Sequence, residues 1–483
     1  MIEDGHKAVV LEKHEKELGG NWVFSEKDEH PSIYESIVIN TSKQNMSFSD
    51  FPTPKKAPYF MHHSQIKKYF DDYADHFGLR QHIRFGKEVL DVEKKGKLWQ
   101  VTHKDVHCGT IEKQLFDAVI IANGKRFYLC EHSFHNFKTL QMIEGHHNKP
   151  HEVTFKGEET FPGEVLHSHA YKKVSPFAGK RVLVVGCGNS GADISVACAD
   201  ACEKVYNAVR TGVLVFPKYI FGAPVDFFGN RLFYMLPDVF QLLFVYPFVY
   251  AIHGYQKVNI LKKQHTTVNE SYIPRVKAGK ICVKPNVKQI YGKIVEFVDG
   301  SKAEVDVIIK AVGYKVHFPF LSHKLLKIEN NQIKTPLFKN AIPFANPELE
   351  GLYFLCLIQP LGSTMPIAEM QSRWFSLLLA NQLRLPNEKE MSEDVRKYKE
   401  EMKSKYYESA RHTIQYDYMP IMDGLASLIG CYPKFERHLD ILFPLLFGTI
   451  VSAQYRLDGP GAKEKICKQI IRDYFEEPNP FHD

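Results

Sequence analysis

The segment from Arg181 to Ser195 constrains the fold of this chain more than any other part of its 483 residues. An apolar run from Val182 to Val185 leads directly into a turn of the form Gly-x-Gly-x-x-Gly, and a helical pattern of apolar residues follows from Ile194 to Ala201. A strand, a glycine-rich turn and a helix in this order predict a dinucleotide site, with the pyrophosphate facing the backbone amides of the helix N-terminus. We expect the turn to bind the phosphates through Gly186, Gly188, Asn189, Ser190 and Gly191.

The end of the next predicted strand indicates which dinucleotide binds. In the NAD form of this site, an acidic residue about 20 positions after the glycine turn binds the ribose 2′-hydroxyl. Here the strand KVYNAVRT carries Arg210 near its end, and the planar guanidinium of arginine suits a phosphate. The sequence therefore favours NADP, with a water-facing arginine at a strand end as the alternative.

The N-terminal residues carry the pattern of a second dinucleotide fold, starting near its second strand. The run Ala8 to Leu11 ends at Glu12, whose carboxylate is placed to accept a hydrogen bond from a ribose hydroxyl. The flexible turn Gly19-Gly20 follows, beside the flat side chain of Trp22. Such a glutamate is expected about 20 residues after a glycine turn, and only 11 residues precede Glu12. We therefore expect the first strand and its glycine turn to be missing, which leaves the neighbouring strands with an unpaired edge.

Composition excludes several classes of protein. Hydrophobic residues make up 44% of the chain and charged residues 24%, as in an ordinary globular protein of two or three domains. The net charge of +6 comes without a dense block of Lys and Arg among aromatic residues, so we expect no nucleic-acid partner. The nine cysteines include no Cys-x-x-Cys pair and the histidines lack ligand spacing, so we expect a reduced compartment and no metal site.

Residues 232–252 form a strongly apolar segment that is interrupted by Pro237, Asp238 and Pro247. A membrane-spanning helix carries fewer such breaks. We interpret the segment as a patch that rests on a membrane surface or covers a substrate channel, with a plain buried helix as the alternative.

Long motifs run through the chain from end to end. Residues 161–171, FPGEVLHSHAY, fit the pattern Phe-x-Gly-x-x-x-His-x-x-x-Tyr, and the other segments are LGGNW at 18–22, NTSKQNMSFSDFP at 40–52, AVGY at 311–314, QPLGSTMPIAEMQSRW at 359–374 and YRLDGPG at 455–461. These motifs resemble those of the flavin-containing monooxygenases of the animal type, over nearly the whole chain. The main departure is the missing first glycine turn, so an N-terminally truncated member is expected.

The resemblance implies FAD and NADP as cofactors and an enzyme of the N,N-dimethylaniline monooxygenase type. In that family NADPH reduces FAD, O₂ forms a hydroperoxide at flavin C4a, and this species oxygenates a soft nitrogen or sulfur of a small amine or sulfide. Asn40 matches the family's asparagine beside the isoalloxazine, which assigns it the catalytic role; capping of the following turn is the alternative. The resemblance also places Gln359 near NADP or the flavin, and Glu12, Gly19, Gly20 and Trp22 around FAD.

The chain is thus predicted to be an α/β protein with two doubly wound, Rossmann-like dinucleotide-binding domains and a largely helical insertion. We expect an FAD-binding domain of residues 1–155 and 316–483, an NADP-binding domain of 156–210 and 281–315, and an insertion of 211–280. His167 and Tyr171 stand four residues apart, and we expect them on one face of a helix between the two domains.

Other functions stay open at this point. One is a Baeyer–Villiger monooxygenase that oxidises ketones, and another is a non-catalytic chain that has lost FAD binding. A disulfide reductase is disfavoured because it needs a pair of cysteines near the flavin. The resemblance implies the endoplasmic reticulum membrane with peripheral association, with the cytoplasm as the alternative, and it leaves a homo-oligomer open.

Overall fold

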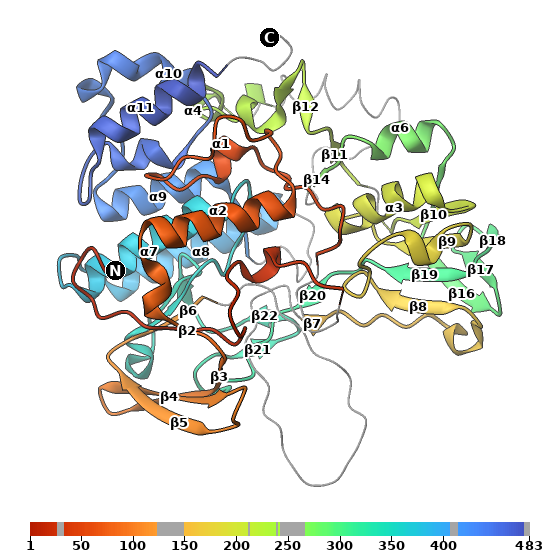
Figure 1. The fold of residues 1–483 in the computed structure, drawn as a ribbon, viewed down its shortest axis with the longest axis horizontal. Helices are drawn as coiled ribbons and strands as arrows, with labels where there is room; N and C mark the ends of the chain where they lie inside the picture. Colours follow the sequence, from red (N-terminus) through yellow and green to blue (C-terminus); the bar gives the residue numbers. More distant parts are fainter. Residues whose placement is uncertain are drawn as a thin grey trace.

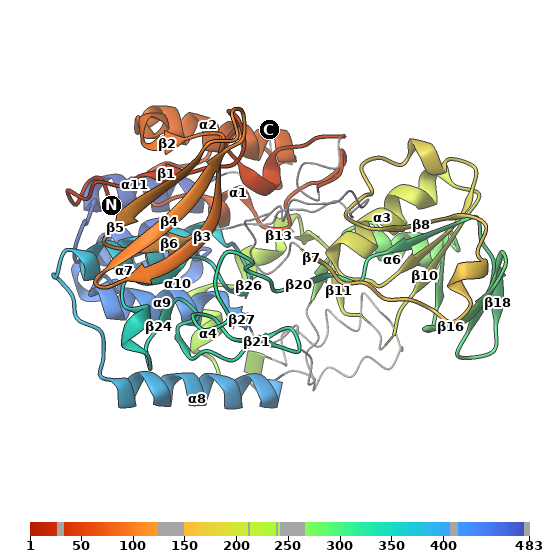
Figure 2. The same cartoon turned by 90° about the horizontal axis from the view of Figure 1, so that it is seen from below.

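The computed structural model describes residues 1–26, 33–122, 149–210, 213–237, 240–241, 266–405 and 414–477. These residues form a larger and a smaller lobe, which two perpendicular views separate clearly (Figure 1, Figure 2). The smaller lobe, on the right in Figure 1, comes from the middle of the sequence, and the larger lobe contains the first and the last described residues.

A five-stranded parallel sheet forms the centre of the smaller lobe. Val182, Leu183 and Val184 of its middle strand are each 0% exposed, as expected of a parallel strand covered on both faces. This arrangement confirms the doubly wound, Rossmann-like fold predicted from the glycine turn. The strand order is β15 (Ile281–Lys284), β10 (Lys204–Ala208), β9 (Arg181–Val185), β19 (Val307–Lys310) and β8 (Glu164–His167), and all neighbours are parallel.

The two faces of this sheet have different covers. Val182 and Val184 pack in one core with α3 (Asn189–Ala201) and α6 (Tyr272–Lys277). Leu183 and Val185 pack in a second core on the other face. That second core includes an antiparallel meander made of β16 (Val287–Tyr291), β17 (Ile294–Phe297) and β18 (Lys302–Glu304).

The parallel strands of the larger lobe stand in separate pairs. β1 (Val10–Leu11) pairs with β2 (Ile83–Arg84), and β6 (Val119–Ile121) pairs with β25 (Leu352–Phe354). Within the described ranges no strand joins these two pairs, and Val10 is 49% exposed. The unpaired edge that the position of Glu12 predicts is therefore present in this part of the structure.

Helices provide most of the core of the larger lobe. Trp374 and Phe375 belong to one buried apolar cluster together with Leu425 and Ile429. The helices are α2 (His63–His76), α7 (Met365–Leu379), α8 (Glu388–Lys405), α9 (Tyr418–Ile429), α10 (Leu442–Phe447) and α11 (Glu464–Phe475), and an antiparallel sheet is made of β3 (Lys87–Lys95), β4 (Leu98–Asp105) and β5 (Ile111–Phe116).

Two chain segments cross between the lobes side by side. β7 (Lys149–Pro150) pairs antiparallel with β20 (Tyr314–Lys315), and both lie between the lobes in Figure 1. The backbone N–H of His151 donates to the carbonyl of Gly313 at 2.8 Å, which extends this pairing. The junction is therefore a short hydrogen-bonded ribbon.

The described part of residues 211–280 consists of short strands and short helices. Much of the apolar segment 232–252, and with it the rest of the helical insertion predicted there, lies outside the described residues. Among the residues that are described, no helix has the length and apolar character to cross a membrane. The short elements here and elsewhere are α1 (Lys43–Met46), α4 (Arg231–Met235), β11 (Val215–Phe216), β12 (Tyr219–Ile220), β13 (Ala223–Pro224), β14 (Thr267–Val268), β21 (Ile328–Glu329), β22 (Gln332–Ile333), β23 (Leu337–Phe338), β24 (Ile342–Pro343), β26 (Gln359–Leu361) and β27 (Gln415–Asp417).

Candidate active site

The glycine turn lies where the strand order of the smaller lobe reverses, between β9 and β19. Gly186 has φ +99°, and a Cβ there would stand 2.5 Å from the carbonyl oxygen of Ala311, just after β19. A Cβ on Gly191 would stand 2.3 Å from the carbonyl oxygen of Gly186, so α3 packs closely on the turn only because Gly191 lacks one. At Gly188 a Cβ would meet no described atom within 4 Å. Two glycines are thus needed by the fold, and the middle one leaves open space where a pyrophosphate would lie.

The insertion lies against this turn. The hydroxyl of Thr267 donates to the carbonyl of Cys187 at 2.9 Å, and the N–H of Val268 donates to Oδ1 of Asn189 at 3.0 Å. Asn189 therefore holds β14 in place, in addition to its predicted role in phosphate binding. Ser190 lies in the first turn of α3.

Arg210 lies two residues beyond the end of β10, and its side chain is exposed. Ala208 at that end pairs with Val185, the last residue before the glycine turn. The guanidinium is therefore carried on the strand next to the turn, at the same edge of the sheet. This is the position at which a 2′-phosphate would be bound.

Asn40 lies in the larger lobe, in a bend just before α1. Its Oδ1 is buried and has no hydrogen-bond partner among the described residues. The cap of α1 is Ser42, whose hydroxyl accepts from the N–H of Asn45 at 3.4 Å. A buried acceptor without a partner is uncommon in folded proteins and is what a hydrogen-bonding ligand would satisfy.

Two charged groups of the insertion hold the segment around Asn40. Nζ of Lys218 donates to the carbonyl of Ile39 at 3.2 Å, and Oδ2 of Asp226 accepts from the N–H of Ser42 at 2.7 Å. Burial lowers the pKa of Lys218 and raises the pKa of Asp226. The backbone on both sides of Asn40 is thus held by two residues of the insertion.

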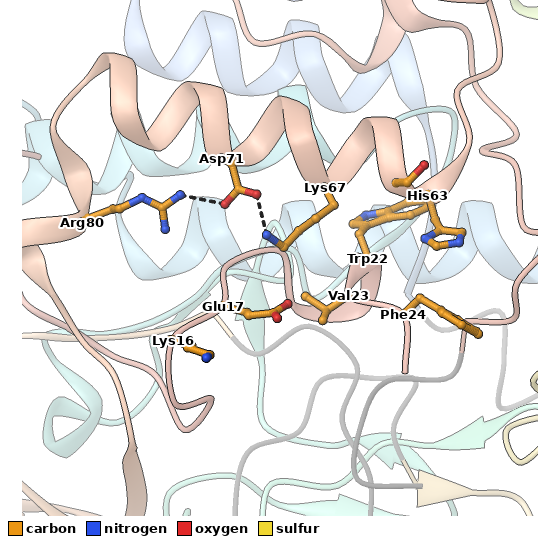
Figure 3. A pocket seen from close by; sticks show the side chains of 10 residues that line it. Lys16, Glu17, Trp22, Val23, Phe24, His63, Lys67, Asp71 and Arg80 are labelled. Atoms are coloured by element: carbon orange, nitrogen blue, oxygen red, sulfur yellow. Dashed lines mark hydrogen bonds and ion pairs between the residues drawn. The ribbon is translucent and has the colours of Figure 1, made fainter. Parts of the chain in front are cut away.

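A cavity of about 610 Å³ opens beside the turn that contains Gly19 and Gly20. Gly19 has φ +114°, and a Cβ there would stand 2.8 Å from Cδ of Lys67 on α2. In Figure 3 the Lys67 ammonium and the Arg80 guanidinium both point to the carboxylate of Asp71, at 2.5 and 2.8 Å. The residues that line the cavity are Lys16, Glu17, Trp22, Val23, Phe24, His63, Ser64, Lys67, Asp71 and Arg80.

Comparison with known proteins agrees with this geometry. A family model described as Flavin-binding monooxygenase-like matches residues 1–480. The chain belongs to the flavin-containing monooxygenase family. It is 34% identical to flavin-containing monooxygenase 5 of Rattus norvegicus over 97% of this chain and 88% of that protein. It is 35% identical to dimethylaniline monooxygenase [N-oxide-forming] 2 of Macaca mulatta over 96% of this chain and 86% of that protein.

Solved structures agree on the fold. S-allyl-L-cysteine S-oxygenase from Allium sativum superposes with a TM-score of 0.66, at 21% identity, over 98% of this chain and 94% of that chain. An open structure of cyclohexanone monooxygenase gives a TM-score of 0.58 at 15% identity, over 88% of this chain and 92% of that chain. This monooxygenase therefore has the two Rossmann-like domains of those flavoproteins.

FAD and NADPH are the cofactors of the family. The glycine turn of the smaller lobe has the shape that a dinucleotide pyrophosphate requires. In the larger lobe, Oδ1 of Asn21 and Oδ1 of Asn40 are both buried acceptors without a partner among the described residues, and the cavity is lined by Trp22. Among the described residues, no strand pairs with both β1 and β6, and so none there could carry a second glycine turn between them.

The structure does not bring together all of the other residues predicted around the flavin. Glu12 lies directly after β1 as predicted, where its carboxylate accepts from the N–H of His14 at 2.7 Å, and it is not among the residues that line the cavity. Gln359 begins β26, the strand that precedes α7. Of the predicted flavin contacts, Trp22 alone lines the cavity, with the Gly19-Gly20 turn beside it.

The helix expected to carry His167 and Tyr171 is a wrong prediction. His167 is the last residue of β8, and Tyr171 follows in a non-helical segment. The main-chain groups of β8 pair with β19 instead, because the parallel sheet satisfies them. His167 still lies at the junction, where its Nε2 is 3.0 Å from the carbonyl of Gly313, and burial lowers its pKa to about 4.

Sequence reasoning missed four polar residues that hold this region together. They are scattered over the sequence and meet only in the fold. Of the four, only Asp193 carried a signal in the sequence, because it places a charge near the start of a packed helix, two residues after Gly191. The four residues are Tyr34, Asp193, Lys218 and Asp226.

Proposed function

We propose that this chain is an NADPH-dependent monooxygenase that oxygenates soft nitrogen or sulfur in small molecules. One observation carries the proposal: the amide oxygen of Asn40 is buried without a partner among the described residues, and the backbone on either side of it is held by Lys218 and Asp226, which belong to the insertion packed on the glycine turn. The arrangement links a dinucleotide site to a buried hydrogen-bonding group in the other lobe. The relatives named as N-oxide-forming and as an S-oxygenase support this choice of substrate.

The residues of the chain bind, orient and exclude water. When bound, FAD supplies the oxygen-transfer chemistry and NADPH supplies the electrons. Gly186, Gly188 and Gly191 would hold the NADP pyrophosphate, and Arg210 would pair with the 2′-phosphate. The Asn40 amide can both donate and accept a hydrogen bond, so it can orient a reacting group beside it.

The surroundings of Asn40 keep water away. Ile39, Met46, Met61 and Met365 form one buried cluster next to it, and none is more than 8% exposed. Exclusion of water protects a reactive oxygen-transferring group from hydrolysis. We assign this cluster the protective role.

The flavin contacts and the division into domains are part of the same proposal. We propose that Gly19, Gly20 and Trp22 border the flavin, with Glu12 and Gln359 as further contacts. The FAD-binding domain would comprise residues 1–155 and 316–483, the NADP-binding domain 156–210 and 281–315, and the insertion 211–280.

Product analysis with three substrates tests the function. The purified protein with FAD and NADPH is offered N,N-dimethylaniline, a thioether and a cyclic ketone, and NADPH oxidation is compared with product formed. We expect N-oxide and sulfoxide in proportion to NADPH consumed. A lactone as the main product would instead indicate a Baeyer–Villiger enzyme, and a protein that takes up no flavin would indicate a non-catalytic role.

Asn40→Ala should lower product formation about 100-fold while NADPH oxidation continues, because a preorganised hydrogen-bonding group is lost. Asn387→Ala is the matched control, since Asn387 caps the start of α8 far from this site in the sequence and is exposed. Equal product from Asn40→Ala and the control would refute the role of Asn40.

We also propose contact with a membrane surface. Met235 on α4 is 72% exposed and Phe443 on the neighbouring α10 is 59% exposed, and Phe447 adds to the same apolar face. Such a face favours the lipid boundary. The protein should sediment with phospholipid vesicles. The double variant Met235→Ser/Phe443→Ser should stay in the supernatant, whereas Ile111→Ser on β5 should sediment like the wild type. Absence of binding would favour a cytoplasmic protein, and a second copy on this face would appear as a dimer.

A further inference from the structure

One carboxylate on the glycine-turn helix joins neighbouring segments and is not among the residues proposed to contact a cofactor. Asp193 lies two residues after Gly191 on α3. Its Oδ2 accepts a hydrogen bond from the hydroxyl of Tyr34 at 2.5 Å, and its Oδ1 accepts from Nδ2 of Asn269 at 2.5 Å. Both oxygens are therefore used by groups from outside the helix.

These two partners come from different parts of the chain. Tyr34 is six residues before Asn40 and packs in the core that covers one face of the smaller lobe's sheet, while Asn269 follows β14, the strand bonded to the glycine turn. Asn269 is itself fixed, because its Oδ1 accepts from the N–H groups of Ser271 and Tyr272 at 2.9 and 2.8 Å. Asp193 thus joins the nucleotide helix, the insertion and the segment that leads to Asn40.

A second route runs in parallel. The charge of Lys218 interacts with Asp193, and Nζ of Lys218 donates to the carbonyls of Val38 and Ile39. The carboxylate of Asp193 therefore reaches the segment from Tyr34 to Asn40 at two places: directly at Tyr34, and through Lys218 just before Asn40.

Burial makes the hydrogen bonds of Asp193 with Tyr34 and Asn269 specific. Tyr34 is 3% exposed and meets Tyr171 edge to face, with ring centroids 5.7 Å apart. Burial raises the pKa of Asp193, and the hydrogen bonds from Tyr34 and Asn269 oppose that rise. An amide in place of the carboxylate would turn a donor toward Tyr34 or Asn269, both of which are donors here.

We propose that Asp193 is a positioning residue that transmits NADP binding from the glycine turn to residues 33–42, the segment that carries Asn40. The inference rests on the proposed function of the glycine turn as the NADP site. Asp193 is not one of the glycine-turn residues that hold the pyrophosphate, so the two roles are separable by mutation.

Hydrogen exchange of the full chain with and without NADP⁺ tests the inference. In the wild-type protein NADP⁺ should slow exchange at least threefold in residues 186–195 and also in 33–42. In Asp193→Asn and in Tyr34→Phe the NADP⁺ Kd should stay within threefold and the slowing of 186–195 should remain, while 33–42 should no longer respond.

Three further variants sharpen the result. Asp200→Asn removes a carboxylate from the last turn of the same helix, where it is paired with Arg275 and half exposed, and it should behave as wild type. Asp193→Glu keeps the charge and should recover part of the response in 33–42. Tyr34→Phe in the Asp193→Asn background should add no further loss, because both changes break the same bond.

The outcomes separate the inference from the function it rests on. Failure of NADP⁺ to bind the wild-type protein overturns the NADP site itself. Normal binding with no response in residues 33–42 of the wild type, or an equal response in the wild type and both variants, overturns the role of Asp193 alone. A more than tenfold weaker Kd in Tyr34→Phe also overturns it, since the pair would then belong to the binding site. If Asp193→Asn does not fold, Tyr34→Phe removes a single hydroxyl and decides the question.

Discussion

The smaller lobe carries one continuous parallel sheet, whereas the parallel strands of the larger lobe stand in separate pairs. In the smaller lobe the sheet itself places the glycine turn, because β9 lies between β10 and β19. In the larger lobe the pairs β1–β2 and β6–β25 share no strand in the described ranges. The comparison teaches that backbone pairing positions one candidate cofactor site, and side-chain contacts position the other.

Buried polar contacts show how the larger lobe is held. Arg231 is 3% exposed, donates to Gln454 at 2.9 Å and pairs with Asp423 at 3.1 Å. Arg456 pairs with Asp50 at 3.1 Å. These bonds join the insertion and the N-terminal segment to the C-terminal helices without any sheet.

The largest expected effect comes from adding atoms to the glycine turn. Gly191→Val would place Cβ 2.3 Å from a backbone carbonyl that cannot move, so we expect a loss of about 3 kcal/mol or more from the smaller lobe and no NADP⁺ binding. Gly188→Ala should fold as wild type and only weaken NADP⁺ binding, because its Cβ points into open space. Urea unfolding and NADP⁺ titration measure both. Equal unfolding of the two variants would break the view that the sheet dictates this site.

The next effect falls on the larger lobe. Arg231→Met should destabilise it by about 3–5 kcal/mol, because Asp423 and Gln454 lose a buried partner. Arg396→Met breaks only exposed ion pairs on α8 and should cost less than about 1 kcal/mol. Thermal unfolding that resolves the two lobes is the measurement. A loss of stability confined to the smaller lobe would contradict the view that side-chain contacts hold the larger lobe together.

The junction between the lobes should respond to acid. His167 has a pKa near 4 when folded, below the usual value near 6.5, so only the unfolded chain takes up the proton as the pH falls through that range. Stability is therefore fully present above pH 6.5, and this group should remove about 2 kcal/mol between pH 7 and pH 5. His167→Gln should flatten the pH dependence of unfolding by that amount, whereas His107→Gln, on an exposed turn, should not. The same slope in His167→Gln and wild type would exclude His167 as the cause.

The smallest effect concerns nucleotide choice. Arg210→Gln should reduce the preference for NADP⁺ over NAD⁺ about tenfold, or about 1.4 kcal/mol, because a charged partner of the 2′-phosphate is lost. Arg275→Gln, on α6 of the same lobe, should leave the ratio unchanged. Binding of both nucleotides to each variant gives the ratio. An unchanged preference in Arg210→Gln would mean that Arg210 only faces water.

Local patterns were sufficient for some elements and insufficient for others. The run Val182 to Val185 and the glycines after it predicted a central strand and its turn, because short-range sterics and burial on both faces leave few other solutions. Residues 164–167 form a strand although His167 and Tyr171 have helical spacing, because β19 offers them backbone partners. A spacing of four is compatible with a helix, but it cannot reveal a neighbouring strand more than 130 residues away.

The sequence by itself determined the Rossmann-like turn and the family to which the chain belongs, since each follows from contiguous residues. Only the tertiary structure decided that Asp193 meets Tyr34, that Lys218 and Asp226 flank Asn40, and that His167 lies half-buried at the junction. The physical reason is that the partners of a buried polar group are chosen by desolvation and geometry across the whole fold. No local pattern encodes which distant donor will satisfy a given acceptor.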